Sequence, residues 1–263
     1  MLEQLWDLIL YNFVGCLLVF VRITGIFTFN PIFGRQNVPM RVRVAMSMAL
    51  AVCVLAGMGD TTGFIPQGVI SFAFVLIMEA LLGLVFGFFV NLMITVLLYA
   101  GEATDKQIGL AMANVMDPGT GIQMPVFATF YYNLFILYFF VTGSHLEYIR
   151  LFVLSYDIIP IGFRVTGVTV NLTYTIAMFI GTVLHLAMKL ALPVIAAGLI
   201  VETCVGVIMK AVPSIQVFVI NIQLKILLGL FVLFAIAIPV SDYINYLFGI
   251  MWGNLDAILH GFI

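Results

Sequence analysis

Few side chains in this sequence could do acid–base or metal chemistry. His145 and Glu147 lie two residues apart, but a zinc-binding helix needs a second histidine one turn away, so this pair does not predict a metal site. The three cysteines, Cys16, Cys53 and Cys204, lie in separate apolar runs, as small core residues do. No phosphate-binding loop, nucleophile elbow or paired-aspartate constellation stands out. The sequence therefore predicts a protein that is not an enzyme and has no catalytic residues, no metal and no cofactor.

Charged groups that could act on a passing molecule are concentrated in a polar segment, residues 100–126. It contains Glu102, Asp105 and Lys106, and it ends in the turn-forming run Asp117-Pro118-Gly119-Thr120-Gly121. Glycine and proline at this density disfavour a regular helix. Two interpretations stay open: a solvated connection between hydrophobic hairpins, or a segment that lines or plugs a watery path, for which small residues and flexible methionines are suited.

The composition around this segment is that of a membrane protein. The chain has 263 residues, of which 64% are hydrophobic and 8% are charged, against about 25% charged in a typical soluble protein. A net charge of −2 gives no reason to expect nucleic acid binding. We predict an all-α, polytopic membrane protein of long tilted helical hairpins with broken helices. It should form one domain, with N-terminal hairpins over 1–100, a polar plug loop over 101–125 and C-terminal hairpins over 126–263.

Two apolar runs, 67–99 and 168–206, are too long for simple membrane spans. A helix over the first would be about 50 Å long, whereas the hydrocarbon core of a bilayer is ~30 Å thick. Such helices must be tilted, kinked, split or not confined to a bilayer. The start of the chain, 1–7, is acidic where a signal peptide is basic, so the first apolar run is expected to remain in the mature protein. Helix breaks are predicted at Pro31, Gly34, Pro39, Pro160, Pro193 and Pro213.

Several charges interrupt the apolar runs and should face protein or water instead of lipid. Arg22 has two interpretations: its guanidinium extends to the membrane interface from near a helix end, or it pairs with a carboxylate in a protein interface. Glu79, Lys189 and Glu202 also suggest an alternative function, a self-contained secondary transporter that uses intramembrane charges. The sequence alone leaves this alternative open.

Short motifs in a fixed order resemble the FliR family of the flagellar type III export gate. The family's central motif is similar to four short segments of this sequence: Ala100-Gly101-Glu102, Gln107-x-Gly109, Asp117-Pro118-Gly119 and Met124-Pro125. The family's first hairpin is similar to this chain at Arg22, Pro31 and Pro39-x-Arg41-x-Arg43. Its middle part is similar at Gly143-Ser-His145-Leu and Ser155-x4-Pro160-Ile-Gly162. Its C-terminal half is resembled by Leu192-Pro193, Pro213-x4-Phe218-Val-Ile and Lys225. The chain departs from the family at Ser214, where glutamine is frequent, and at Asn221-Ile222-Gln223, where glycine-x-proline is frequent. The homologous injectisome export protein, SctT, is a close relative of this family.

This resemblance implies a subunit that forms the secretion channel with FliP and FliQ and meets FlhA- and FlhB-type gate proteins. The channel would export unfolded flagellar proteins from the bacterial inner membrane, within the flagellar basal body, with its core raised above the bilayer plane on the periplasmic side. The implied plug residues are Lys106, Gln107, Gly109, Leu110, Met112, Asn114, Met116, Asp117, Pro118, Gly119, Gln123 and Met124. The implied intersubunit or buried polar residues are Arg22, Glu79, Glu102, Lys189, Glu202 and Lys225.

Overall fold

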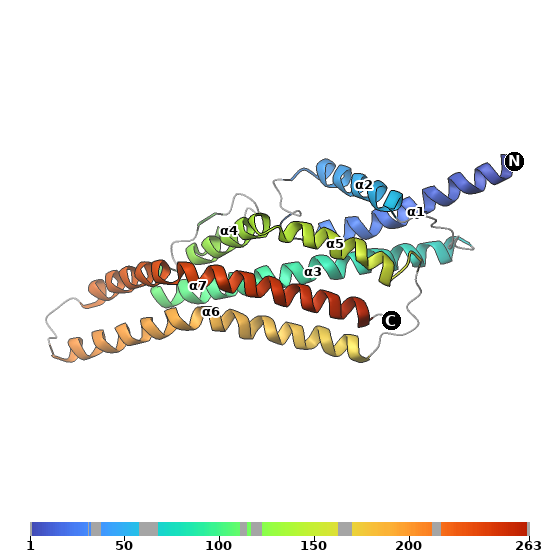
Figure 1. Ribbon diagram of the computed structural model, residues 1–263. Helices are drawn as coiled ribbons and strands as arrows, with labels where there is room; N and C mark the ends of the chain where they lie inside the picture. The colour runs from blue at the N-terminus through green and yellow to red at the C-terminus, as the bar shows by residue number, and fades with distance from the viewer. Residues whose placement is uncertain are drawn as a thin grey trace. The chain divides into compact units, whose positions relative to one another are not determined.

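Long helices make up nearly all of the described chain (Figure 1). The computed structural model describes residues 2–30, 32, 38–57, 68–110, 115–116, 123–162, 170–211 and 217–261. The prediction of an all-α polytopic membrane fold is confirmed. The elements are α1 (Leu2–Phe29), α2 (Met40–Gly57), α3 (Val69–Ile108), β1 (Val115–Met116), β2 (Gln123–Met124), α4 (Val126–Val141), α5 (Ser144–Ile158), α6 (Val170–Ala211) and α7 (Val217–Gly261).

The two over-long apolar runs form continuous helices, α3 with 40 residues and α6 with 42. Within the described residues, three helical stretches are long and apolar enough to cross a membrane, namely Met40–Gly57, Val69–Ile108 and Ala177–Ala211. The number rises to five if two bent pairs each count as one span, Val126–Val141 with Ser144–Ile158 and Gln223–Ala235 with Pro239–Leu259. Between its two ends, a helix satisfies its own backbone hydrogen bonds, which is the condition for lying in lipid.

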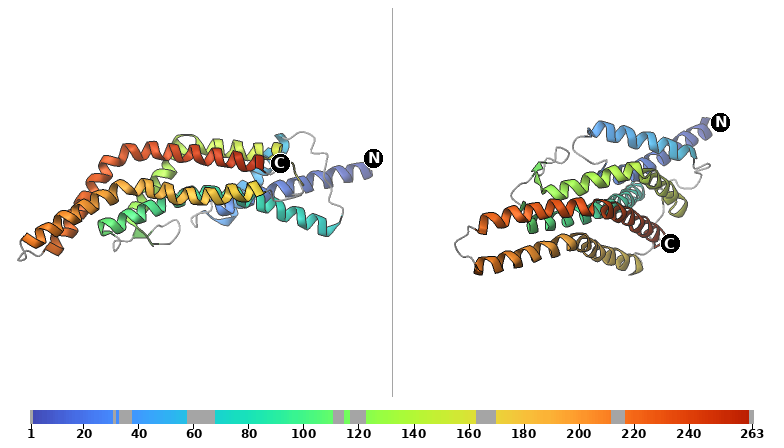
Figure 2. Two further views of the ribbon diagram at one scale, coloured as in Figure 1. Left: turned by 90° about the horizontal axis from the view of Figure 1, so that it is seen from below. Right: turned by 60° about the vertical axis from the view of Figure 1, so that its left-hand side comes forward.

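The chain forms two compact units, and α3, α6 and α7 contribute to both. The first unit comprises residues 1–91, 145–177 and 251–263, and its core includes an edge-to-face pair, Phe152 and Tyr156, with ring centroids 5.3 Å apart. The second unit comprises residues 92–144 and 178–250, where the rings of Phe135 and Phe248 lie 4.9 Å apart. In this second unit α6 and α7 run side by side (Figure 2), and the Tyr243 hydroxyl donates to the Leu186 carbonyl at 2.6 Å.

Prolines begin and end helices at some of the predicted breaks. Pro39 precedes α2, and its carbonyl accepts the Val42 N–H at 2.9 Å. Pro160 follows the end of α5. Pro193, in contrast, lies inside α6, where the sequence predicts a break. A proline removes one hydrogen bond from the helix, and the neighbouring apolar residues Ala191 and Val194 are fully buried, so packing offsets the loss. Pro31, Gly34 and Pro213 lie outside the described residues.

The polar segment begins as helix, so the loop predicted over 101–125 is shorter in the structure. Helix α3 continues to Ile108, and Glu102 and Lys106 form an i,i+4 ion pair at 2.7 Å along its last turns. Gly109 then ends the helix with φ +85°, a left-handed conformation that favours glycine. Residues 109–125, between α3 and α4, are called the central loop below. Strands β1 and β2 pair within it in antiparallel fashion, Val115 opposite Met124.

Candidate functional site: two buried polar clusters

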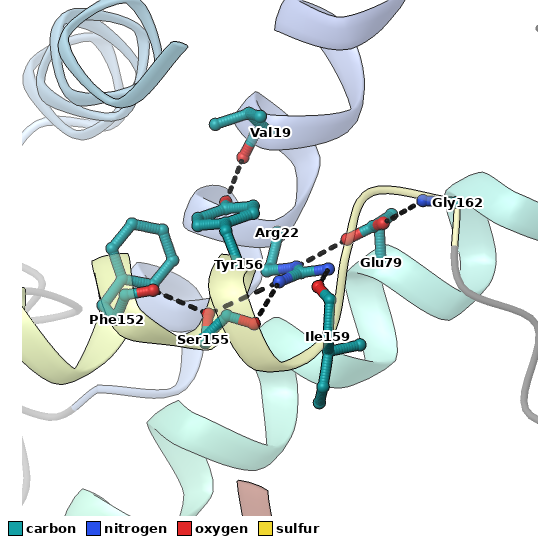
Figure 3. A network of polar contacts seen from close by, with 8 residues as sticks. All are labelled: Val19, Arg22, Glu79, Phe152, Ser155, Tyr156, Ile159 and Gly162. Atoms are coloured by element: carbon teal, nitrogen blue, oxygen red, sulfur yellow. Dashed lines mark hydrogen bonds and ion pairs between the residues drawn. The ribbon is translucent and has the colours of Figure 1, made fainter. Parts of the chain in front are cut away.

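The first polar cluster surrounds Arg22, whose side chain is 1% exposed (Figure 3). Its Nε donates to Glu79 Oε2 at 2.6 Å, which forms an ion pair between α1 and α3. Its Nη2 donates to the Ile159 carbonyl at 3.1 Å, and its Nη1 lies 3.4 Å from both the carbonyl and the hydroxyl of Ser155. The last carbonyls of a helix have no partner inside the helix, so the guanidinium supplies donors to the C-terminal end of α5.

Glu79 and Tyr156 complete this cluster. The second Glu79 oxygen, Oε1, accepts the Gly162 N–H at 3.1 Å, which holds the turn after α5. The Tyr156 ring packs over the guanidinium with 4.2 Å between the Arg22 Cζ and the ring centroid, and its hydroxyl donates to the Val19 carbonyl. Both Glu79 oxygens therefore have donors, and the buried charge of Arg22 is matched. The arrangement joins α1, α3 and α5.

The second polar cluster lies at the base of the central loop. Asp105, on the last turn of α3, is fully buried, and its Oδ2 accepts the Phe127 N–H in the first turn of α4 at 2.9 Å. The first N–H groups of a helix need acceptors from outside the helix, and Pro125 at the start of α4 makes no side-chain cap. Asp105 therefore acts as the cap of α4 and holds the two ends of the central loop together.

A close backbone contact brings α3 and α4 to this distance. A Cβ added at Gly101 would lie 2.3 Å from both the Cα and the N of Ala128, so only glycine fits. Thr104 is also fully buried there, and its hydroxyl donates to the Ala100 carbonyl at 2.9 Å. The loop base is thus a tight helix crossing with one buried carboxylate in it.

Sequence comparison with known proteins identifies the family of this chain. Residues 13–251 match the family described as bacterial export proteins, family 1. The chain belongs to this family. It is 31% identical over 217 residues to the flagellar biosynthetic protein FliR of Bacillus subtilis, with 81% of this chain and 82% of the relative covered. It is 25% identical over 240 residues to FliR of Escherichia coli, with 91% and 90% covered. It is 26% identical over 224 residues to the surface presentation of antigens protein SpaR of Shigella sonnei, with 82% of each chain covered.

These matches confirm the resemblance to the FliR family. The chain is a membrane-located component of a flagellar or type III export apparatus, and membership of the family implies association with other components of that apparatus. No group of three or more histidine, cysteine or acidic side chains that could hold a metal ion occurs in the part of the chain that the structure describes.

The residues predicted for the plug lie in and next to the central loop. Lys106 is exposed on α3, and the half-buried Gln107 contacts α6, since a Cβ added at Gly198 would meet the Gln107 Cγ at 2.7 Å. Leu110 follows Gly109 at the start of the loop. Met116 lies in β1, and Gln123 and Met124 form β2. The remaining predicted plug residues, Met112, Asn114, Asp117, Pro118 and Gly119, lie outside the described residues.

The other charges predicted as intersubunit or buried lie nearer the surface of this chain. Lys225 on α7 pairs with Glu202 on α6, with side chains 15% and 42% exposed. Glu102 is 43% exposed in its pair with Lys106. Lys189 is exposed, and its Nζ lies 5.5 Å from the centroid of the Tyr246 ring. Contacts of these groups with other subunits stay predictions.

Sequence reasoning assigned no role to Asp105 and no hydrogen bonds to Ser155. In the sequence, Asp105 is one of several charges in the polar segment. Its spacing of four residues from Gly101 places both on one face of a helix, but this does not predict which residue the carboxyl contacts. Ser155 lies 133 residues from Arg22, a separation at which the sequence carries no signal of contact.

Proposed function

We propose that this chain is a non-enzymatic subunit of the flagellar type III protein export gate that forms the secretion channel with FliP and FliQ. In this proposal the central loop plugs the channel until unfolded flagellar proteins pass. FlhA- and FlhB-type gate proteins are further partners. The site of action is the bacterial inner membrane within the flagellar basal body, with the channel core raised above the bilayer plane on the periplasmic side.

The observation that carries this proposal is the central loop, whose strands β1 and β2 pair and whose two ends are held together, in a chain of an export family. A plug must be held firmly where it joins the channel wall and must adapt where it fills the opening. The Asp105–Phe127 bond and the Gly101–Ala128 contact hold the ends, and three methionines in and beside the pairing strands supply adaptable apolar volume.

The exposed apolar faces of the long helices support a multi-subunit assembly in a membrane. Large apolar side chains that are more than half exposed occur on α6 and α7, and they include Leu184, Ile200, Val207, Leu227, Phe231 and Phe234. Large apolar side chains exposed in this number on long helices are expected to contact lipid or other subunits. FliP- and FliQ-type subunits and lipid are the covering surfaces in this proposal.

Removing the central loop should make the membrane leaky. We expect cells in which residues 110–124 are replaced by a short Gly/Ser linker to show a several-fold higher resting ion conductance than cells with the unaltered chain at equal expression. Gly109 is retained because it ends α3, and Asp105 still holds α4, so the helices should assemble normally. Ion flux is measured in cells and in planar bilayers with the purified assembly.

An equal-length Gly/Ser loop is the matched control. It restores the chain length but removes the side chains, so a leak in both variants assigns the seal to those side chains. Normal conductance in the deletion variant, with normal assembly, would refute the plug. Mild-detergent purification of a tagged chain tests the partners: FliP- and FliQ-type subunits should copurify in one large particle. A lone monomer that moves a small solute in liposomes would instead establish the transporter alternative.

A further inference from the structure

Asp105 is a buried ionisable group that lies outside the Arg22 cluster. Its carboxyl is fully buried, yet only Oδ2 has a donor, and Oδ1 has no hydrogen-bond partner among the described residues. Burying a carboxyl without full hydrogen bonding is costly, and an apolar residue would fill the same space without this cost. The carboxyl meets the backbone N–H groups of Phe127 and Ala128 in the first turn of α4, and this cap is therefore the feature that its position serves.

The Asp105–Phe127 bond closes the base of the central loop, close to the two points where the loop joins α3 and α4. Gly109, with φ +85°, follows Asp105 by one turn, and its N–H donates to the Asp105 carbonyl at 3.0 Å. Pro125, with φ −57° and ψ 153°, precedes Phe127 by two residues in an extended conformation. Both junctions lie on the loop side of the Asp105–Phe127 bond, so this bond joins α3 and α4 next to the points where the loop begins and ends.

The Gly101–Ala128 contact sets the length of this bond. Gly101 precedes Asp105 by four residues and lies on the same helix face, and the absent Cβ allows the α4 backbone to approach within contact distance. A larger residue at this position would push α4 away and take the Phe127 N–H out of reach of the carboxylate. Two separate features, a carboxylate and a glycine, thus act on one hydrogen bond.

We propose that Asp105 is the positioning residue of the plug: by capping α4 it keeps the base of the central loop closed and thereby keeps the resting channel sealed. This inference rests on the proposed function. It predicts that losing the cap loosens the loop base and lets the resting channel leak, although every residue of the loop is present.

The test compares Asp105→Ala, which removes the acceptor, with Asp105→Asn, whose amide oxygen can still accept the Phe127 N–H. Asp242→Ala, the same change at an exposed aspartate on α7, is the matched control. Loss of a helix cap should raise the opened population of the loop base roughly 5- to 30-fold, the factor that corresponds to 1–2 kcal/mol. Amide hydrogen exchange in the first turn of α4 and resting ion conductance are both measured on the purified assembly.

We expect Asp105→Ala to speed exchange at the start of α4 and to leak, and Asp105→Asn and Asp242→Ala to do neither. Gly101→Ala should reproduce the result of Asp105→Ala. Suppose that the loop deletion leaks but that Asp105→Ala shows faster exchange and no leak. This result would overturn the positioning role of Asp105 and would leave the plug function of the loop intact. Unchanged exchange in Asp105→Ala would overturn the cap itself. A loop deletion that does not leak would refute the plug, and exchange would then report on the cap alone.

Discussion

Replacing Arg22 by alanine is expected to destabilise the first unit by about 3–5 kcal/mol, the usual effect of removing one partner of a buried ion pair. Glu79 would be left as an uncompensated buried carboxylate, and the Ile159 carbonyl would lose the donor that Arg22 Nη2 supplies. Because a whole domain is stable by only about 5–15 kcal/mol, we expect little of this variant to be recovered in the assembled particle. The measurement is the fraction of tagged chain in the particle, together with its thermal unfolding.

Arg150→Ala is the matched control for this prediction. Arg150 lies on α5 with its side chain 80% exposed, and it is 3.9 Å from Glu147. Exposed ion pairs contribute little to stability, so this variant should assemble normally. A double variant, Arg22→Met with Glu79→Leu, should recover part of the lost stability, because it leaves no buried charge. Recovery should be incomplete, since the Gly162 N–H then lacks its acceptor. Normal assembly of Arg22→Ala would show that the ion pair does not hold the first unit together.

The second large effect is expected at Gly83, where α1 and α3 cross. A Cβ added there would lie 2.0 Å from the carbonyl oxygen of Arg22 and 3.1 Å from the Cα of Gly25. Backbone atoms cannot move aside as a flexible side chain can, so Gly83→Ala must push the two helices apart. Overpacking of this kind costs about 1–3 kcal/mol and occasionally more. The same displacement would lengthen the bond between Arg22 and Glu79, which adds to the loss.

Gly181→Ala provides the comparison, because a Cβ at Gly181 on α6 meets no atom within 4 Å. Alanine is the better helix former by about 0.5–1 kcal/mol, so this variant should be neutral or slightly stabilised. Thermal unfolding of the purified assembly distinguishes the two substitutions. If Gly83→Ala and Gly181→Ala both unfold at the same temperature as the unaltered protein, α1 and α3 do not cross at this distance.

Local features of the fold could be predicted from the sequence because their causes are local. Runs of apolar residues longer than a bilayer is thick predict long membrane helices. The predicted loop begins at residue 101, whereas α3 continues to Ile108. Residues 101–108 are polar as in a loop, but they are helical and include the i,i+4 ion pair between Glu102 and Lys106. Pro193 likewise looks like a break, yet α6 continues through it.

The polar clusters could not be predicted, because their members are distant in the sequence. Arg22 is separated from Glu79 by 57 residues and from Ile159 by 137, and a charge pattern alone does not say which carboxylate meets which guanidinium. Sequence by itself determined a helical membrane protein of an export family with one polar loop. Only the tertiary structure decided that Arg22 and Asp105 are buried and which helix ends they serve, because burial and pairing depend on how helices cross, and those crossings are set by glycines whose neighbours lie elsewhere in the chain.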